Sequence, residues 1–341
     1  IRQQLLARCA KGRLEGVTVF ITGGTGVVGR PLLQRLVADG ANVRALVRTD
    51  ESAAWISSVG ADPVHGDIND VPALLSGMEG AETVFHVAGI NALCARDPSP
   101  MYRANVDGTR NVVRAANAVG VRRLIHTSSA VVLGEPKGTV GREDVEHRGF
   151  VLSHYERSKT LAEQVAFAES GDVEVVAVNP SSVQGPGRAT GTGKLLLDVL
   201  NGRLRVMVDT NLSIVDIDDC TEGHLLAWHR GEAGRRYILS GFTMNTREAV
   251  AVLEQVTGRR FSVRYAPVGA AIALGGIAGG VFRMTRRPSP VCREMVRVLA
   301  HGHSYDGSSA TRELGLQYHR PADTIERTVA WFRSEGLLTS P

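Results

Sequence analysis

The stretch TGGTGVVGR (residues 22–30) decides the fold, because it places a glycine-rich turn between a strand pattern and a helix pattern. The preceding VTVFI (17–21) is β-branched and apolar throughout, as expected for a strand covered on both faces. The following RPLLQRLVADG (30–40) has apolar residues at helical spacing and stops at a glycine. Apolar strands and helical segments alternate in this way to about residue 180. This alternation predicts an α/β fold of the Rossmann type, a doubly wound parallel sheet.

The glycines of this turn match two spacing patterns. Gly24, Gly26 and Gly29 satisfy GxGxxG, and Gly23, Gly26 and Gly29 satisfy GxxGxxG. Glycine permits the tight turn and the close approach of a pyrophosphate, which then binds free amides at the helix N-terminus. Glycine turns without a ligand are frequent, but the position between strand and helix favours a dinucleotide site.

The chain divides into three predicted parts. Residues 1–16 form an N-terminal extension, 17–180 a dinucleotide-binding domain, and 181–341 a smaller C-terminal substrate-binding lobe, from which a strand or two returns to the sheet. Within the lobe, NTREAVAVLEQVTG (245–258) predicts an amphipathic helix capped by Asn245 or Thr246 and stopped by Gly258.

Composition excludes several classes of protein. Hydrophobic residues make up 43% of the chain, charged residues 22%, and the net charge is only +4, as in an ordinary globular protein. No basic stripe with interleaved aromatic residues indicates a nucleic-acid partner. The chain start is basic and lacks the apolar core of a signal peptide, so we expect a cytoplasmic protein. The four cysteines are far apart, and we expect buried thiols in a reducing compartment.

The end of the second predicted strand indicates which dinucleotide binds. An NAD site usually presents an acidic residue there to the ribose hydroxyls, whereas this strand ends ALVRTD, with Arg48 in that place. An arginine gains energy from a 2′-phosphate and not from a plain ribose, which favours NADP over the alternative, NAD. Asp67, after the third strand, either accepts from the adenine amino group or caps the next helix, and Ile68 can pack on the adenine ring.

Tyr155 and Lys159, in SHYERSKTLAEQ (153–164), lie one helical turn apart on the same face. A surface helix often carries such a pair. A catalytic pair is the alternative, because a nearby cation lowers the pKa of a phenol.

Several motifs in order resemble the extended short-chain dehydrogenases/reductases, also called the NAD-dependent epimerase/dehydratase superfamily. The matching pieces are TGGTGVVG, GDI, FHVAG, NVDGT, HTSSAVVLG, YERSK and NPSSVQGPG, with a looser match to the C-terminus. Within this superfamily the chain looks closest to the dihydroflavonol reductase-like, hopanoid-associated and 3β-hydroxysteroid dehydrogenase-like members.

The resemblance implies catalytic roles for four residues. Tyr155 would be the proton donor or acceptor, Lys159 would hold the nicotinamide ribose and lower the tyrosine pKa, and Ser129 would bind the substrate oxygen. Asn105 would order the site. The implied cofactor-binding residues are Thr22, Gly23, Thr25, Gly26, Val27, Val28, Gly29, Arg48, Asp67, Ile68, Val87, Ala88, Gly89, Thr127, Tyr155, Lys159, Asn179, Pro180 and Ser182.

Departures from the family pattern weaken a sugar-nucleotide function. Gly89 replaces a usual alanine, Leu133 and Gln184 stand where tyrosines are common, and Asn179 stands where arginine is common. The leading hypothesis is therefore an NADP-dependent reductase of a bulky apolar ketone or aldehyde, or a dehydrogenase of the matching alcohol. The alternatives are a nucleotide-sugar epimerase or dehydratase with tightly bound NAD, using Arg188, Arg203 or Arg205 for the diphosphate, and a non-catalytic NADP sensor.

The segment YAPVGAAIALGGIAGGVF (265–282) carries no charged residue and is followed by basic RMTRRP (283–288). We expect an apolar helix that closes over the substrate pocket, or alternatively a peripheral membrane contact through 265–287. The family resemblance further implies a homodimer. No metal site is expected, because His301 and His303 form an isolated HGH pattern.

Overall fold

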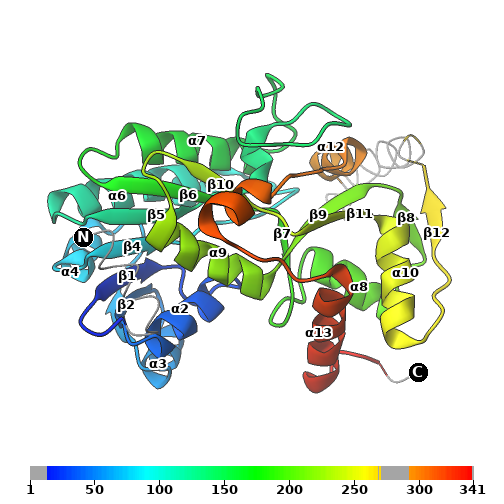
Figure 1. The fold of residues 1–341 in the computed structure, drawn as a ribbon, viewed down its shortest axis with the longest axis horizontal. Helices are drawn as coiled ribbons and strands as arrows, with labels where there is room; N and C mark the ends of the chain where they lie inside the picture. The colour runs from blue at the N-terminus through cyan, green and yellow to red at the C-terminus, as the bar shows by residue number, and fades with distance from the viewer. Residues whose placement is uncertain (1–13, 268, 270–291, 340–341) are drawn as a thin grey trace.

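The computed structural model describes residues 14–267, 269 and 292–339. Its centre is a parallel seven-stranded sheet in the order β10-β6-β5-β4-β1-β2-β3 (Figure 1). The first six strands in the chain come from the part before residue 181, and β10 comes from the second half to pair with β6. The strands are β1 (Thr18–Thr22), β2 (Asn42–Val47), β3 (Asp62–His65), β4 (Thr83–His86), β5 (Arg123–Thr127), β6 (Glu174–Pro180) and β10 (Arg236–Leu239). The predicted Rossmann fold is confirmed.

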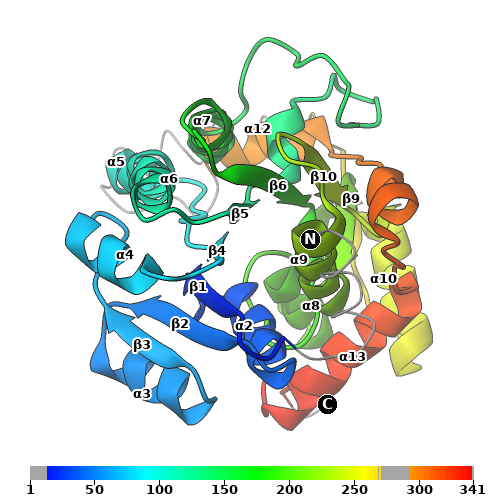
Figure 2. The ribbon, with the colours of Figure 1, turned by 60° about the vertical axis from the view of Figure 1, so that its left-hand side comes forward.

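Both faces of the sheet are covered by helices, as Figure 2 shows. Because neighbouring residues of a strand point to opposite faces, Val19 and Ile21 join one hydrophobic core and Phe20 joins the other. The first core contains residues of α2 (Gly29–Ala38), α3 (Asp50–Ser58) and α9 (Ile217–Arg230). The second contains residues of α4 (Val71–Met78), α6 (Gly108–Ala118) and α7 (His154–Ala168).

Short elements join the strands to these helices. α5 (Ser99–Tyr102) continues into η1 (Arg103–Asp107), a π-helical segment that leads into α6. After β5, the 3₁₀-helix η2 (Ala130–Leu133) carries the chain away from the sheet. Asp70 caps α4 by accepting a hydrogen bond from the backbone of Ala73. The cap is therefore Asp70, and the alternative prediction that Asp67 caps this helix is wrong.

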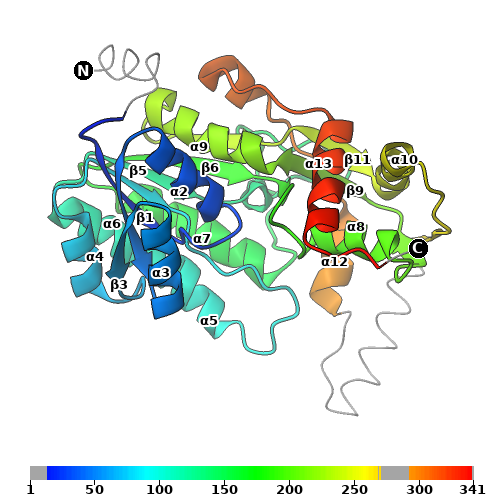
Figure 3. The same cartoon turned by 90° about the horizontal axis from the view of Figure 1, so that it is seen from below.

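The C-terminal half adds a lobe beside the sheet, seen at the right of Figures 1 and 3. Asn245 forms a capping box with Glu248 at the start of one of its helices, and Gly258 ends that helix with φ 68°, as predicted. The lobe's strands are β7 (Ser182–Gln184), β9 (Asn211–Asp216), β11 (Phe242–Asn245), β8 (Val206–Val208) and β12 (Arg264–Ala266). Its helical segments are α8 (Thr192–Leu200), α10 (Thr246–Thr257), α12 (Arg293–His301), η3 (Ala310–Leu314) and α13 (Pro321–Ser334).

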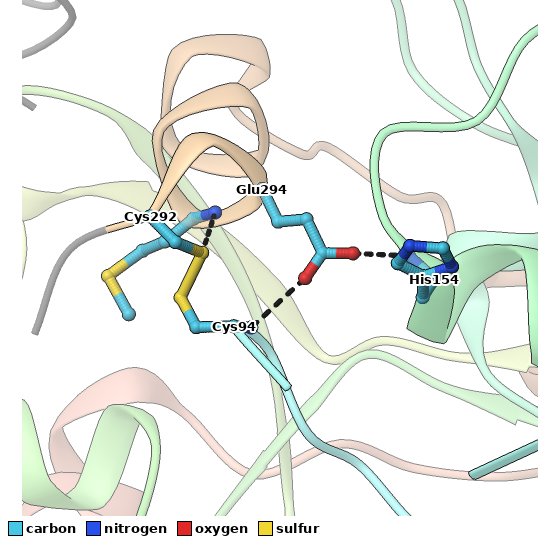
Figure 4. The surroundings of a disulfide bond; sticks show 5 residues. Cys94, His154, Cys292 and Glu294 are labelled. Atoms are coloured by element: carbon cyan, nitrogen blue, oxygen red, sulfur yellow. Dashed lines mark hydrogen bonds between the residues drawn. A yellow bond between two sulfur atoms is a disulfide. The ribbon is translucent and has the colours of Figure 1, made fainter. Parts of the chain in front are cut away.

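Cys94 and Cys292 form a disulfide, which corrects the expectation of buried thiols (Figure 4). The two residues lie 198 positions apart, so their spacing in the sequence gives no sign of the pairing. The disulfide joins the loop after β4 to the start of α12. Cys220 is a buried free thiol, as expected, and Cys9 lies outside the described residues.

Most of the uncharged segment 265–282 also lies outside the described residues, as do 283–287. The expectations of a pocket lid and of a membrane contact therefore concern residues outside the described part of the chain. Among the residues that the structure describes, no helix has the length and apolarity needed to cross a membrane.

Candidate active site

The glycine turn is shaped by contacts that a side chain would block. Gly23 has φ +74°, and a Cβ there would lie 2.5 Å from the backbone nitrogen of Ala88 at the end of β4. A Cβ on Gly29 would lie 2.0 Å from the carbonyl oxygen of Gly23. At Gly26 a Cβ would meet only that same oxygen, at 3.3 Å, and nothing else within 4 Å. The turn is thus tightly packed on its inner side and open at Gly26, which fits a pyrophosphate against the N-terminus of α2.

The other predicted residues of the turn differ in their burial and in their hydrogen-bond partners. Thr22 is fully buried; its Oγ1 lies 2.8 Å from Nδ1 of His86 and accepts from the Ala88 backbone at 3.3 Å. Thr22 therefore ties β1 to β4. Val27 and Val28 are partly buried against the core, and Thr25 accepts a hydrogen bond from Arg30. Val87 and Ala88 follow β4 directly and line the same edge.

Arg48 lies at the end of β2, exposed, and forms no ion pair with any residue that the structure describes. Arg44, the other arginine of this strand, is engaged, because it donates to the carbonyl oxygens of Gly77 and Glu79 at 3.2 and 2.6 Å. Of these two arginines, Arg48 is the one available to a phosphate.

Asp67 and Ile68 have different surroundings after β3. Asp67 accepts from the backbone and the side chain of Asn69, at 3.0 and 2.9 Å, and forms a local turn. Ile68 is buried and packs against Gly108, where a Cβ would lie 2.5 Å from its Cδ1. Ile68 thus belongs to the hydrophobic core on this face of the sheet, and its predicted packing on the adenine ring stays a prediction.

The predicted catalytic residues meet beyond the carboxyl end of β5. The Ser129 side chain lies near enough to the Tyr155 phenol to influence its pKa, which supports Ser129 over Ser128 as the functional serine. Burial raises the pKa of Tyr155 above its ordinary value, while Ser129 and the charge of Arg188 oppose the rise. Tyr155 is therefore a protonated phenol at neutral pH, suited to donate a proton to a substrate oxygen.

Lys159 is buried one turn further along α7, and its Nζ donates to the carbonyl oxygen of Thr127 at 2.7 Å. Burial lowers the pKa of Lys159 to about 8, with Glu163 opposing the shift. The expectation that Lys159 lowers the tyrosine pKa is not what this structure shows, because its ammonium is directed to the end of β5. The groups that lower it here are Ser129 and Arg188.

Asn105 is buried in η1 and organises the loop after β4. Its Oδ1 accepts from the Ile90 backbone at 2.8 Å, and its Nδ2 donates to Ile90 O at 2.9 Å and to Ser158 Oγ at 2.8 Å. A Cβ on Gly89 would lie 3.3 Å from Asn105 Oδ1 and 3.7 Å from Lys159 Nζ. Gly89 therefore lies beside both side chains, and the absence of a Cβ leaves space next to them.

The residues predicted after β6 have mostly internal partners. Asn179 is fully buried and donates to Glu163 Oε2 at 2.7 Å and to Ser129 O at 3.2 Å, so it supports the segment that carries Ser129. Pro180 ends β6, and Ser182 Oγ contacts Thr192 at 2.9 Å.

The histidines of β4 and β5 lie under the site. His86 contacts Thr22 and Thr109, whereas neither ring nitrogen of His126 has a hydrogen-bond partner in the described part of the chain. Burial, then the charge of Lys159, lowers the pKa of both, to about 3 for His86. Both are neutral, and His86 is a core histidine with a partner at each ring nitrogen.

Three functional contacts escaped the sequence analysis. Ser158 receives the Asn105 amide, Glu294 binds the backbone N–H of His154, and the Arg188 guanidinium acts on Tyr155. The YxxxK pattern includes Ser158 but gives no sign of its partner. Arg188 drew attention only as a candidate ligand of a diphosphate.

Two cavities lie near this region. A cleft of about 580 Å³ runs along the outer side of α7, lined by Leu133, Glu143, Arg157 and Leu161, and its lining does not include Ser129, Tyr155 or Lys159. A cavity of about 20 Å³ lies inside the C-terminal lobe, next to β7, and its walls are largely apolar. The catalytic residues thus define the site, and the larger cleft is a separate surface feature.

Known proteins are similar to this chain in sequence and in fold. Residues 19–240 match the model of the NAD dependent epimerase/dehydratase family. A putative dihydroflavonol 4-reductase of Synechocystis sp. is 34% identical over 94% of this chain and 95% of its own length. Sterol demethylase protein B of Methylococcus capsulatus is 30% identical over 94% of this chain and all of its own length.

Among solved structures, gox2253 superposes with a TM-score of 0.83 at 30% identity, covering 95% of this chain and 99% of that one. The family match, the similar relatives and the shared fold agree, so the chain belongs to the NAD-dependent epimerase/dehydratase family, the extended short-chain dehydrogenases/reductases, and is an NAD(P)-dependent oxidoreductase.

Proposed function

We propose that this protein is an NADP-dependent reductase of a bulky apolar ketone or aldehyde, or the dehydrogenase of the corresponding alcohol. The observation that carries the proposal is the placement of Ser129 beside a protonated Tyr155, beyond the end of β5. In the reduction direction, a carbonyl oxygen accepts hydrogen bonds from Ser129 and Tyr155, and Tyr155 delivers its proton as negative charge develops there.

The dinucleotide supplies the hydride in this reaction. The glycine turn and the N-terminus of α2 would hold its pyrophosphate, and Lys159 would hold the ribose next to the nicotinamide. Asn105 hydrogen-bonds to the Ile90 backbone, in the loop after β4, and to Ser158, in the helix α7. These bonds hold the loop against the helix. These residues position the reactants and exclude alternative geometries.

Arg48 supports NADP over NAD. It lies exposed where β2 ends, at the place where NAD enzymes of this fold present an acidic side chain. A guanidinium there can form a charge-assisted contact with a 2′-phosphate. Asp50 and Glu51, in the first turn of α3, lie nearby in the sequence and keep NAD as the alternative.

The apolar substrate rests on two observations. The uncharged sequence 265–282 argues for it. The names of the two similar proteins, a dihydroflavonol reductase and a sterol demethylase protein, also refer to bulky, weakly polar molecules.

One observation favours the second candidate, a nucleotide-sugar epimerase or dehydratase. Arg188 lies close enough to Tyr155 for its charge to lower the pKa of the phenol, so a cation lies near the proposed proton donor. Such a cation suits a diphosphate. The departures at Leu133, Asn179 and Gln184 weigh against it.

A substrate panel tests the proposal. Sterol-like, flavonoid-like and alkyl ketones and their alcohols are incubated with NADPH, NADH, NADP or NAD, and the cofactor absorbance is followed. The proposal predicts net turnover with at least one apolar ketone and NADPH. Epimerisation of a UDP-hexose by enzyme-retained NAD, without net NADPH consumption on any ketone, would favour the second candidate.

A further inference from the structure

Glu135, His301 and His303 come together at the junction of the two halves of the chain. Glu135 follows η2, and the histidines stand at and just after the end of α12. Glu135 Oε1 lies 2.7 Å from Nδ1 of His303 and 3.3 Å from Nε2 of His301. The two histidines of the HGH pattern therefore lie beside the carboxylate of Glu135, a residue 168 positions away from His303 in the sequence.

The cluster is buried and incompletely hydrogen-bonded. Glu135 is 1% exposed and His301 9%. Glu135 Oε2 and His301 Nε2 are both buried and have no hydrogen-bond partner among the residues that the structure describes, although His301 Nε2 lies 3.3 Å from Glu135 Oε1. A buried carboxylate oxygen and a buried imidazole nitrogen with free lone pairs are costly unless a proton donor or a cation satisfies them.

The hydrogen bonds of His303 leave Glu135 Oε2 and His301 Nε2 without a partner among the described residues. Nδ1 of His303 lies 2.7 Å from Glu135 Oε1 and 2.8 Å from Oη of Tyr305. If Nδ1 carries a proton, it donates to the carboxylate, and the phenol oxygen can also accept from it. If Nδ1 carries none, it accepts from the phenol and its lone pair competes with the carboxylate. A cation shared by the nitrogen and the carboxylate is a further way to satisfy both groups.

The local charges are also unbalanced. Two buried carboxylates, Glu135 and Glu156, lie in this region, and Arg148 forms its ion pair with Glu156. Arg148 reaches Glu135 only at the backbone oxygen, at 3.4 Å. Within the described chain, no lysine or arginine forms an ion pair with the Glu135 carboxylate. One negative charge is left, and buried charges of this kind are paired or bind metals.

We propose that Glu135, His301 and His303 form a site for a divalent transition metal ion, with Zn²⁺ as the preferred occupant. Two imidazole nitrogens and one carboxylate oxygen are a donor set that Zn²⁺ takes, with a fourth position left for water. All their ligand atoms lie within 4.8 Å of one another. The ion would join the segment after Ser129 to the end of α12 and so fix the C-terminal half against the sheet domain. This site is separate from the hydride-transfer reaction.

A second cluster, Asp216, Asp219 and His319, provides an internal control. There Arg327 forms ion pairs with Asp216 and Asp218, and His319 contacts Asp219 at 2.5 Å. The guanidinium already supplies the positive charge that a metal would bring, so we expect no tight metal binding.

The test is titration of the chelator-treated full chain with ZnCl₂ by calorimetry, without added thiols and near neutral pH. The wild type should bind one equivalent that Glu135→Gln and His303→Gln lose or bind at least about tenfold more weakly, since even outer partners of metal ligands cost 10–100-fold. His319→Gln should retain this binding. Equal binding by wild type and both cluster variants, or loss in His319→Gln alone, would overturn the proposal.

Co²⁺ titration of the wild type keeps the proposal testable if the variants fail to fold. Four-coordinate Co²⁺ bound by nitrogen and oxygen ligands gives a saturable visible spectrum without the charge-transfer bands of thiolate ligands. That spectrum, displaced by Zn²⁺ and accompanied by a higher thermal midpoint with Zn²⁺, is the expected result. No saturable spectrum, or one with thiolate bands, would contradict the site.

Discussion

The carboxylate of Glu294 accepts a hydrogen bond of 2.6 Å from the backbone N–H of His154, the residue before Tyr155. Its other oxygen accepts from the backbone N–H of Cys94 at 3.0 Å, beside the Cys94–Cys292 disulfide (Figure 4). A carboxylate at the N-terminus of α7 also interacts favourably with the helix dipole. One residue of α12 therefore fastens the catalytic helix, the loop after β4 and the C-terminal half together.

Reduction of the Cys94–Cys292 disulfide should destabilise the protein. The bond closes a loop of 198 residues, and loss of such a cross-link typically costs about 2–5 kcal/mol. Urea unfolding with and without a phosphine reductant measures the change in the free energy of unfolding. A Cys94→Ser/Cys292→Ser variant serves as control and should not respond to the reductant. Equal stability of the oxidised and reduced wild type would show that the disulfide has no such role.

The Lys159 ammonium should set an upper limit to the pH range of activity. Burial lowers its pKa to about 8, so it carries its charge below that pH and loses it above, instead of near 10.5. We expect kcat/KM to fall as the pH rises through about 8. Lys159→Arg, which keeps its charge, should show no such decline even if its rate is lower. A flat wild-type profile between pH 7 and 10 would contradict this role.

Arg48→Asp should reverse the cofactor preference. Loss of a charged hydrogen bond of roughly 1.5–3 kcal/mol should weaken NADPH binding about 10- to 100-fold, with little effect on NADH. Fluorescence titration with both cofactors measures the ratio of the two dissociation constants. Arg44→Ala is the matched control, because Arg44 donates to the end of α4 and should affect stability without changing the ratio. Preference of the wild type for NADH would refute the assignment.

We propose, from family resemblance, a homodimer in which the α6 and α7 helices of two copies pair. Light scattering at micromolar concentration should give twice the chain mass. Leu161→Asp, on the outer side of α7, should shift the mass toward the monomer because it places a charge in the apolar contact. Ser57→Asp, exposed on α3 on the other face of the sheet, should leave the dimer intact. A monomeric wild type would rule the proposal out.

Local patterns in the sequence account for most of the fold and for the centre of the site. Three features depend only on residues close together in the sequence, so their spacing predicts their structure. They are the glycine turn, the YxxxK pair and the capping residues Asn245 and Gly258. The Asp70 cap was missed because two acidic residues lie within one turn of the helix start and only backbone geometry distinguishes them.

Such local patterns could not predict contacts between segments that are far apart in the sequence. The disulfide, the Glu294–His154 hydrogen bond and the Glu135 cluster each join parts of the chain more than 100 residues apart. They depend on how the C-terminal half packs against the sheet domain. The direction of the Lys159 ammonium likewise depends on the position of the β5 carbonyl.

The most direct test of the proposed reaction is the turnover of Tyr155→Phe on the best ketone of the panel with NADPH. The ring remains and the proton donor is lost, so cofactor binding and thermal midpoint should stay close to the wild type. The rate of NADPH oxidation should fall by about 10²- to 10⁴-fold. A rate within a few-fold of the wild type would remove Tyr155 from the mechanism and contradict the central claim.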